Sequence, residues 1–286
     1  MNEFSFSKSK IDFEKSLEKA VFSLGESSKL RDACEYALLN GGKRIRPLIV
    51  FMIAHAIGKN FDVLQAALCI EYFHTASLIV DDLPCMDNDD FRREKPSLHK
   101  VFGEATALLA SYSLMTAGFQ KVYEGSKEYA KYANNSNEIC SIALHEISLA
   151  AGLDGATGGQ YLDLYPDTLS LERVKSIIEK KTTRLFETSF LYGWLFGGGD
   201  LSLLQTIKKI GYHFGMAFQI ADDLKDFMQD KKRENSINLA LILGQKKAKE
   251  AFNLECLQLN ELVKTLKIKT ENFFLLQKKL EDYAKN

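Results

Sequence analysis

The sequence predicts an all-α fold. Apolar residues recur three and four positions apart along most of the chain, as in Leu30, Cys34, Ala37 and Leu38, which is the period of an amphipathic helix. Only 4 prolines occur in 286 residues, and this favours long uninterrupted elements. Runs of β-branched residues and hairpin dipeptides between alternating segments are nearly absent, so strands are not expected.

The predicted helices follow one another between short breaks. Apolar periodicity marks helices near residues 30–38, 66–80 and 214–227. Over residues 246–286, Lys and Glu alternate with Leu and Phe, which predicts amphipathic helices that close the bundle. The breaks lie at residues 40–42, 58–60, 83–84, 95–96, 134–137, 165–167, 197–199 and 230–235. Because no Pro-, Ser- or Gly-rich linker divides the chain, we expect about ten helices in a single domain spanning residues 1–286.

The composition and charge exclude several classes of protein. Lys+Arg (37) nearly cancels Asp+Glu (38), and the net charge of -1 provides no general cationic field for nucleic acid. With 46% hydrophobic and 26% charged residues, the chain is neither disordered nor collagenous. The five cysteines are scattered without a C-x-x-C pair, so neither a disulfide framework nor a structural zinc site is expected. No charge-free apolar run reaches about 18 residues, and the N-terminus lacks a signal pattern, so we expect a cytoplasmic protein without a membrane anchor.

The strongest chemical signal is a carboxylate cluster that follows the predicted helix 66–80. Its members are Asp81, Asp82, Asp87, Asp89 and Asp90. Such crowding is unfavourable unless a cation lies among the carboxylates, and oxygen ligands suit Mg²⁺ held together with substrate phosphates. Arg92 and Arg93 follow directly, and guanidinium groups match phosphate oxygens. The alternative interpretation is a solvated helix end. Taken alone, an acidic run of this kind is an exposed surface about half the time.

A second acidic cluster lies on the predicted helix 214–227. Asp222 and Asp226 are four residues apart and therefore share one helix face, with Asp223 beside them. An exposed face is again the alternative, but the apolar residues that precede the cluster argue against it. Two acidic clusters on apolar helices suggest opposite walls of one cavity.

Two basic segments are candidate phosphate sites. Residues 41–47, Gly-Gly-Lys-Arg-Ile-Arg-Pro, combine a glycine break and three cations with a proline suited to the first turn of a helix. They lack the spacing of a P-loop. Residues 180–184, Lys-Lys-Thr-Thr-Arg, place cations and hydroxyls in the middle of another helix. Taken alone, each segment is also compatible with an exposed polar surface.

Together these segments resemble the trans-isoprenyl diphosphate synthases, the family of farnesyl and geranylgeranyl diphosphate synthases. The resemblance extends over residues 30–244, and its four motifs occur in the family's order. The motifs are residues 41–47 (G-G-K-R-x-R-P), 81–87 (first aspartate-rich motif), 159–163 (G-Q-x-x-D) and 218–226 (second aspartate-rich motif). The resemblance implies the isoprenoid synthase fold, a helical prenyltransferase bundle around a deep central cavity, and a homodimer.

The resemblance also implies a reaction and a role for each matching residue. An allylic diphosphate ionises, isopentenyl diphosphate attacks the allylic cation, and a proton is lost. The implied ligands of three Mg²⁺ ions, with Mn²⁺ as the alternative metal, are Asp81, Asp82, Asp87, Asp222 and Asp226. The implied contacts of the allylic diphosphate are Arg92, Lys181, Thr182 and Gln219, and those of isopentenyl diphosphate are Lys43, Arg46, His74 and Arg93. The implied catalytic residues are Asp81, Asp82, Asp87, Asp222 and Lys181. His74 by itself reads as a packed core histidine, so its role comes from the resemblance alone.

Product length is expected to depend on the side chains that precede Asp81. The resemblance implies that bulk about one turn before the first aspartate limits the product, and Phe73, Ala76 and Ser77 occupy that approach. The small Ala76 favours a C20 product, whereas Phe73 or Tyr112 as a pocket floor would restrict it to C15. The alternative for Tyr112 is simple packing between helices.

The sequence departs from the family pattern at three places. Thr183 and Glu94 each stand where the family usually has glycine. Residues 235–240 replace a K-x-T-Y-P segment, so its phosphate-contacting lysine is missing. The basic residues that could substitute are Lys231, Lys232 and Arg233.

The resemblance favours a short-chain prenyltransferase that makes farnesyl diphosphate. A geranylgeranyl diphosphate synthase is the alternative enzyme, and a non-catalytic subunit of a prenyl synthase is the alternative outside catalysis. A terpene cyclase would have no need of a second diphosphate site, and residues 41–47 argue against it.

Overall fold

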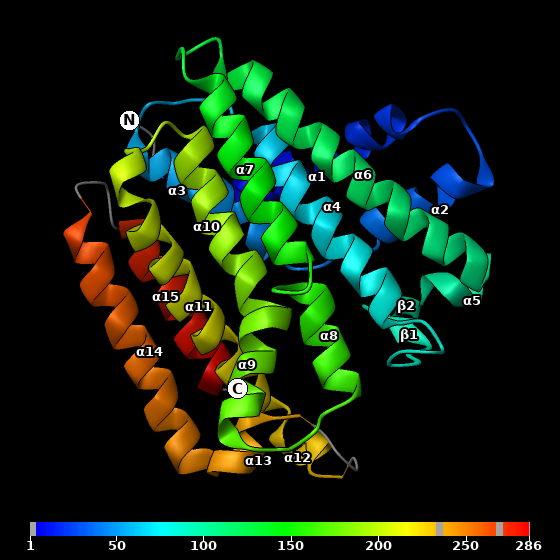
Figure 1. Cartoon of the computed structure of the whole chain (residues 1–286), viewed down its shortest axis with the longest axis vertical. Helices are drawn as coiled ribbons and strands as arrows, with labels where there is room; N and C mark the ends of the chain where they lie inside the picture. Colours follow the sequence, from blue (N-terminus) through cyan, green and yellow to red (C-terminus); the bar gives the residue numbers. More distant parts are fainter. Residues whose placement is uncertain (1–3, 233–236, 267–270, 286) are drawn as a thin grey trace.

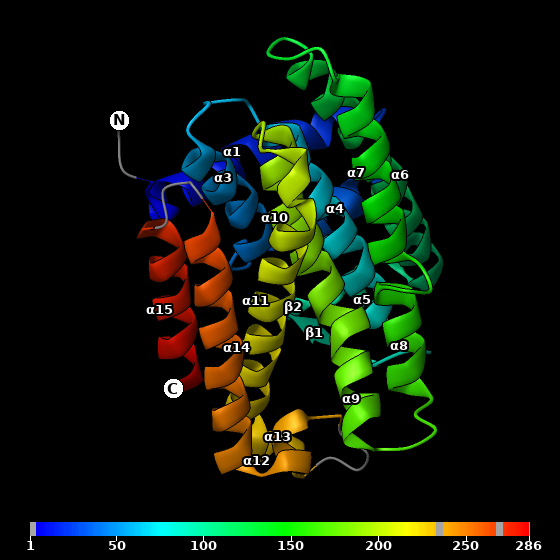
Figure 2. The same ribbon diagram turned by 60° about the vertical axis from the view of Figure 1, so that its left-hand side comes forward.

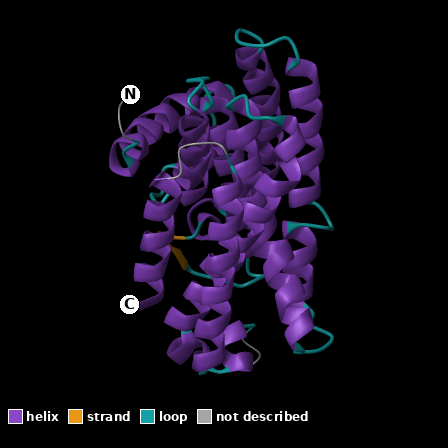
Figure 3. Ribbon diagram, turned by 90° about the vertical axis from the view of Figure 1, so that its left-hand side faces the viewer, coloured by secondary structure: helices purple, strands orange, loops and turns teal. Residues whose placement is uncertain are grey.

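The all-α fold predicted from periodicity is confirmed. A computed structural model describes residues 4–232, 237–266 and 271–285, and long helices run roughly along one axis of the molecule (Figure 1, Figure 3). The helices are α1 Phe6–Val21, α2 Lys29–Leu38, α3 Ile45–Ile57, α4 Leu64–Asp81, α5 Leu98–Phe102, α6 Glu104–Tyr129, α7 Ser136–Ala151, α8 Ala156–Leu164, α9 Leu171–Ile178, α10 Arg184–Phe196, α11 Leu204–Lys225, α12 Phe227–Asp230, α13 Leu239–Leu243, α14 Gln245–Thr265 and α15 Glu271–Lys285. A π-helical segment, Glu179–Thr183, joins α9 to α10, and short 3-10 turns cover Phe22–Leu24 and Leu201–Leu203.

The helix α10 is the centre of the bundle. Every residue from Leu185 to Phe196 is buried, including the polar residues Glu187, Thr188 and Ser189, as expected for a helix at the centre of a bundle. Leu191, Leu195 and Phe196 belong to one hydrophobic core with α4, α6 and α7. The opposite face of α10 belongs to a second core with α3, α11 and α14. Figure 2 shows α10 between α4 and α11, and this position fixes the two acid-bearing helices relative to each other.

The two aspartate-rich motifs lie at the C-terminal ends of α4 and α11. In Figure 1 both helices run from the upper part of the molecule towards its lower half. The C-terminal end of a helix carries partial negative charge, which disfavours a nearby carboxylate by about 0.3–1 kcal/mol. Each motif therefore lies where the backbone increases the need for a cation.

A short hairpin follows the first motif, although no strand was expected. The strands β1 (Phe91–Arg92) and β2 (Lys95–Pro96) pair antiparallel. The two loop residues Arg93 and Glu94 have φ of 54° and 68°, as a two-residue hairpin loop of the primed type requires. Sequence patterns missed the loop because glycine or asparagine normally occupies such positions. The positive φ at position 94 explains why the family usually has glycine there, since glycine adopts this conformation without strain.

One stretch is long and apolar enough to resemble a membrane-spanning helix, although it includes charged residues. Ser136–Leu164 has the length and hydropathy of a membrane-spanning helix, with a mean hydropathy of 1.2 in its most apolar window. The structure divides it into α7 and α8, of 16 and 9 residues, around the turn at Gly152 and Gly155. Only 28% of that window is buried, so α7 and α8 leave apolar surface exposed.

Candidate active site

The first acidic motif folds back on the end of α4. The backbone N–H of Asp87 donates to the carbonyl oxygen of Asp81 at 2.9 Å, which brings the two aspartates to one side of the loop. Gln160 on α8 donates to Asp87 Oδ1 at 3.1 Å. Lys181 Nζ lies 4.0 Å from Asp87 Oδ2 and contacts the carboxylate of Asp163. The cluster is thus built from α4, its loop, α8 and the π-helical segment.

The electrostatics of this cluster call for additional positive charge. Burial raises the pKa of Asp81 to about 7 against the opposing effect of Lys181, and the neighbouring Asp87 and Asp82 raise it further. In the described part of the chain, no three His, Cys, Asp or Glu side chains converge closely enough to hold a metal by themselves. Two carboxylates completed by substrate phosphates are the donor set that Mg²⁺ accepts. The residues present therefore fit a metal that binds together with a diphosphate.

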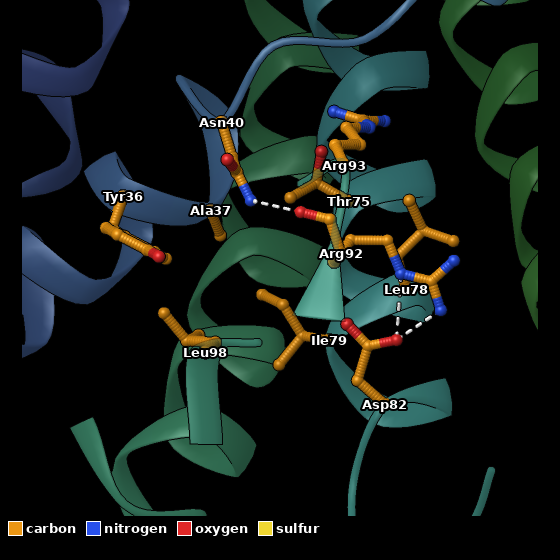
Figure 4. A pocket seen from close by; sticks show the side chains of 10 residues that line it. All are labelled: Tyr36, Ala37, Asn40, Thr75, Leu78, Ile79, Asp82, Arg92, Arg93 and Leu98. Atoms are coloured by element: carbon orange, nitrogen blue, oxygen red, sulfur yellow. Dashed lines mark hydrogen bonds and ion pairs between the residues drawn. The ribbon is translucent and has the colours of Figure 1, made fainter. Parts of the chain in front are cut away.

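Asp82, which is expected to join Asp81 and Asp87 as a metal ligand, pairs with Arg92 in this structure. Its side chain is buried, with 3% of the residue exposed, and it accepts a hydrogen bond from Arg92 Nε at 2.9 Å and a second from Nη2. Asn40, in the bend that follows α2, donates to the carbonyl oxygen of Arg92 at 3.2 Å, beside a pocket of about 30 Å³ (Figure 4). A carboxylate enclosed in this way positions Arg92.

The residues expected to bind isopentenyl diphosphate gather between α3, α4 and the hairpin. Arg46 is half-buried, with its guanidinium 4.1 Å from the centre of the Phe186 ring, and burial lowers its pKa to about 10. Arg93 donates to the carbonyl oxygen of Gly41. Burial, together with Arg46 and Arg93, lowers the pKa of His74 well below its usual range. His74 is therefore neutral at pH 7 within a cationic site. Lys43 is exposed, and it lines a cavity of about 310 Å³ with residues of α1, α11 and α15.

Beneath these cations lies a buried ion pair that sequence patterns did not reveal. Arg44 has left-handed backbone geometry with φ of 53°, and its guanidinium contacts Glu71 on α4 and Glu14 on α1. It also donates to the carbonyl oxygen of Leu38 at 2.6 Å. Glu71 is 1% exposed and interacts electrostatically with Arg46 as well. Within the basic motif, Arg44 therefore fixes the loop through its buried contacts with Glu71 and Glu14.

The π-helical segment connects the two acidic motifs. Lys181 contacts the first motif, and the hydroxyl of the next residue, Thr182, donates to Gln219 Oε1 at 2.9 Å. Gln219 in turn donates to Asp223 Oδ1 at 2.9 Å. A π-helical turn interrupts the regular helix and is frequent at functional sites. Here it directs Lys181 towards the first acidic motif and the next residue, Thr182, towards the second.

Two glycines allow the neighbouring helices to approach this segment. A Cβ atom at Gly159 on α8 would lie 2.4 Å from the backbone nitrogen of Lys181. A Cβ atom at Gly215 on α11 would lie 2.9 Å from Thr183 Cα. Thr183 is fully buried at a position where the family usually has glycine, and Gly215 on the neighbouring helix leaves room for its side chain.

The second acidic motif divides its aspartates among different tasks. Asp222 is half-buried and interacts electrostatically with Arg46, whereas Asp226 is exposed at the end of α11. Asp223 is buried and accepts a hydrogen bond from the Leu239 backbone N–H at 2.7 Å. Burial raises the pKa of Asp223 to about 7, against the opposing effect of Gln219. Asp223 therefore anchors the chain that follows α12.

The segment that replaces the family's lysine loop has a structural contact of its own. Asn238 is fully buried and donates to the carbonyl oxygen of Asp223 at 2.9 Å. Lys231 and Lys232 are exposed after α12. Arg233 lies outside the described residues.

The residues expected to set product length divide between the inside and outside of the chain. Phe73 and Ala76 are buried, and Ser77 is half-buried. The Phe73 ring lies against α6, where a Cβ atom at Gly118 would come within 2.6 Å of it. Tyr112 is 53% exposed on α6. The expectation that Tyr112 forms a pocket floor is therefore wrong for the interior of a single chain, because its helix face points outwards.

Comparison with known proteins agrees with the four motifs. A family model described as polyprenyl synthetase matches residues 27–239. The chain is 38% identical over 260 residues to a farnesyl diphosphate synthase of Geobacillus stearothermophilus, with 86% of each chain covered. It is 36% identical over 218 residues to large subunit 2 of a heterodimeric geranylgeranyl pyrophosphate synthase of Arabidopsis thaliana, covering 74% of this chain and 56% of that relative.

Solved structures of similar proteins share the helical arrangement. A geranyltransferase of Legionella pneumophila superposes with a TM-score of 0.85 at 26% identity, covering 98% of this chain and 97% of that chain. A geranyltranstransferase of Thermotoga maritima superposes with a TM-score of 0.75 at 30% identity, covering 98% of both chains. The resemblance to the trans-isoprenyl diphosphate synthases is confirmed, and the chain belongs to the polyprenyl synthetase family.

Proposed function

We propose that the chain, residues 1–286, is one catalytic domain that makes farnesyl diphosphate. It condenses isopentenyl diphosphate head-to-tail with dimethylallyl and then geranyl diphosphate, and each step releases diphosphate. The observation that carries this proposal is the contact of Lys181 with the first acidic motif and of Thr182 with Gln219 beside the second. A diphosphate held between two acidic walls needs both cations and hydroxyl donors, and this segment supplies them.

The metal ligands in this proposal are Asp81 and Asp87 on one wall and Asp222, with Asp226, on the other. Three Mg²⁺ ions, or Mn²⁺ in their place, would neutralise the charge that develops on the leaving diphosphate. Asp82 contributes by orienting Arg92, whose guanidinium also lies 3.2 Å from Asp89.

The two diphosphates have separate contacts. Arg92, Lys181, Thr182 and Gln219 bind the allylic diphosphate, and Lys43, Arg46, Arg93 and His74 bind isopentenyl diphosphate. The neutral imidazole of His74 can donate one N–H to a phosphate oxygen without adding to the charge of the four surrounding arginines. The apolar residues of α4 before Asp81 exclude water from the allylic cation. The released diphosphate accepts the proton, so no protein base is required.

Product length distinguishes the main proposal from a geranylgeranyl diphosphate synthase. Phe73 lies two helical turns before Asp81, so its ring limits the depth available to a growing chain at about 12 Å along α4. The test incubates the purified chain with isopentenyl diphosphate, dimethylallyl diphosphate and Mg²⁺ and then sizes the dephosphorylated alcohols. A C15 alcohol supports the proposal, and a dominant C20 alcohol replaces it with the alternative.

The same experiment addresses the non-catalytic alternative. A subunit that only shapes another enzyme's cavity forms no product by itself, so prenyl alcohols from the lone chain exclude it. Replacing Lys43 by alanine should raise the KM for isopentenyl diphosphate with little effect on the KM for the allylic substrate. An unchanged KM for isopentenyl diphosphate contradicts the second diphosphate site.

We further propose a cytoplasmic homodimer that associates through α6. Large apolar side chains are exposed along this helix, namely Leu108, Leu109, Tyr112, Phe119 and Tyr123. Contiguous exposed apolar surface of this kind favours association, and a two-fold axis would pair the surface with itself. Light scattering at micromolar concentration tests this, and a monomer that is fully active contradicts it.

A further inference from the structure

We propose that Lys181 competes with the divalent metal in the unloaded site. Its ammonium group lies between Asp163 and Asp87 and beside Asp81, and a metal ion binds tightly there only when a diphosphate draws Lys181 away. This inference rests on the proposed function, since it concerns the metal and the diphosphate of that reaction.

The geometry makes Lys181 a substitute cation. Lys181 Nζ contacts Asp163 and lies 4.0 Å from Asp87 Oδ2, with 27% of its side chain exposed. An ordinary lysine ammonium is protonated at neutral pH, and here two carboxylates lie within ion-pair distance of it. The group is therefore charged throughout the physiological pH range, and the two carboxylates of the first motif already have a cation beside them.

The segment around Lys181 fixes its backbone, whereas the side chain makes its contacts as ion pairs of the ammonium group. Gly159 packs against the Lys181 backbone, and Thr182 is hydrogen-bonded to Gln219. The lysine side chain itself has four flexible carbons and three donors that can be redirected. Asp163 is the positioning residue in this scheme, because its contact keeps the ammonium partly away from Asp81 and Asp87.

The competition couples metal binding to diphosphate binding. A divalent ion between Asp81 and Asp87 would lie close to the Lys181 ammonium, and like charges in a half-buried site repel strongly. A diphosphate offers Lys181 several anionic oxygens and removes this repulsion. Because such coupling is reciprocal, each ligand raises the affinity for the other by the same factor.

Metal binding in the absence of substrate tests the proposal. Mn²⁺ is titrated into the whole chain, and free Mn²⁺ is followed by electron paramagnetic resonance. We expect Lys181→Met to bind Mn²⁺ at least tenfold more tightly than the wild type. The matched control is Lys180→Met, since Lys180 donates to the Leu153 carbonyl at 3.0 Å and lies 3.6 Å from Asp154, away from the cluster. Equal affinities of Lys181→Met and the wild type overturn the proposal, as does an equal gain in Lys180→Met.

A second variant, Asp163→Asn, should change the Mn²⁺ affinity in the opposite direction. Asp163→Asn releases Lys181 to pair fully with Asp81 and Asp87, so this variant should bind Mn²⁺ more weakly than the wild type. In the double variant Lys181→Met, Asp163→Asn, the affinity should return to that of Lys181→Met, because Asp163 acts through Lys181. A double variant as weak as Asp163→Asn makes Asp163 a metal ligand and overturns the proposal.

Inorganic diphosphate supplies the coupled measurement, corrected by a protein-free titration for the complex it forms with Mn²⁺. It should raise the Mn²⁺ affinity of the wild type at least tenfold and that of Lys181→Met by much less. An equal gain in both overturns the proposal. No turnover is measured, so the competition can hold in a chain that makes no prenyl product, and it can fail in one that makes farnesyl diphosphate.

Discussion

Replacing Gly159 by alanine tests whether the close approach of α8 to the π-helical segment is needed for catalysis. The new Cβ atom would lie 2.4 Å from the Lys181 nitrogen and 2.7 Å from its Cα, whereas ordinary contact begins at 3.4 Å. The difference between 3.4 and 2.4 Å requires either α8 or the segment to move by about 1.0 Å. Both neighbours are backbone atoms, so no side-chain rotation can relieve the contact.

The expected consequence is a loss of activity larger than the loss of stability. A misplacement of about 1 Å costs on the order of 10²-fold in rate, because Lys181 and the metal held by Asp87 would then no longer meet the diphosphate together. Overpacking costs about 1–3 kcal/mol of unfolding free energy, which leaves a protein of this size folded. We therefore expect kcat to fall about 100-fold, while thermal unfolding remains cooperative and its midpoint falls by a few degrees.

The assay measures steady-state kcat and KM at saturating Mg²⁺, beside thermal unfolding followed by circular dichroism. Tyr161→Ala is the matched control, because Tyr161 lies on the same helix and is 60% exposed. Its kcat should stay within about threefold of the wild type. If Gly159→Ala also keeps a kcat within threefold of the wild type, Lys181 need not be held at this spacing and the reasoning is wrong.

Three further substitutions test other parts of the structure. Phe73→Ala should shift the product from C15 towards C20, whereas Tyr112→Ala should leave the product length unchanged because Tyr112 points outwards. Sizing of the dephosphorylated alcohols compares the two variants. The reverse pattern contradicts the interior position of Phe73. Glu94→Gly should raise the unfolding free energy by about 0.5–1 kcal/mol, because relief of about 1–2 kcal/mol of left-handed strain exceeds the cost of the greater entropy that glycine gives the unfolded chain. Urea unfolding measures this gain. The control Glu94→Ala, which keeps its Cβ atom, should show no such gain. Burial raises the pKa of Glu187 from 4.5 to about 7, so the native state binds more protons than the unfolded state between these values and loses up to about 3 kcal/mol of stability as the pH rises through them. Glu187→Gln should abolish that part of the pH dependence, and urea unfolding at pH 4.5 and pH 8 measures it; parallel losses in both proteins refute the assignment.

Much of the candidate site could be predicted because its chemistry is local in sequence. Asp81 and Asp87 are separated by a loop of five residues, and the backbone contact that joins them needs no distant partner. Gln160 and Asp163 are three residues apart on one helix, so their common face follows from helix geometry alone. The spacing of Gln160 and Asp163 could be read from the sequence. Their partners, Asp87 for Gln160 and Lys181 for Asp163, could not, because those residues lie on other elements.

The pairing of charges depended on elements that are far apart in the chain. Asp81 and Asp82 are adjacent and chemically identical, yet one faces Asp87 and the other is enclosed by Arg92. The hairpin that carries Arg92 decides this, and its loop has left-handed residues that sequence patterns do not anticipate. The role of Arg44, to which the resemblance assigned none, likewise depended on the packing of α1 and α4, which places Glu14 and Glu71 against it.

The sequence by itself determined the helical fold, the family and the chemical types present at the site. Helical periodicity and short motifs are encoded within one or two turns, so they need no knowledge of distant contacts. Only the tertiary structure decided that Asp82 positions an arginine, that Tyr112 lies outside, and that Lys181 occupies the space beside Asp81 and Asp87. The physical reason is that burial and charge pairing depend on which helices meet around α10, and that arrangement minimises the free energy of the whole chain rather than of any one segment.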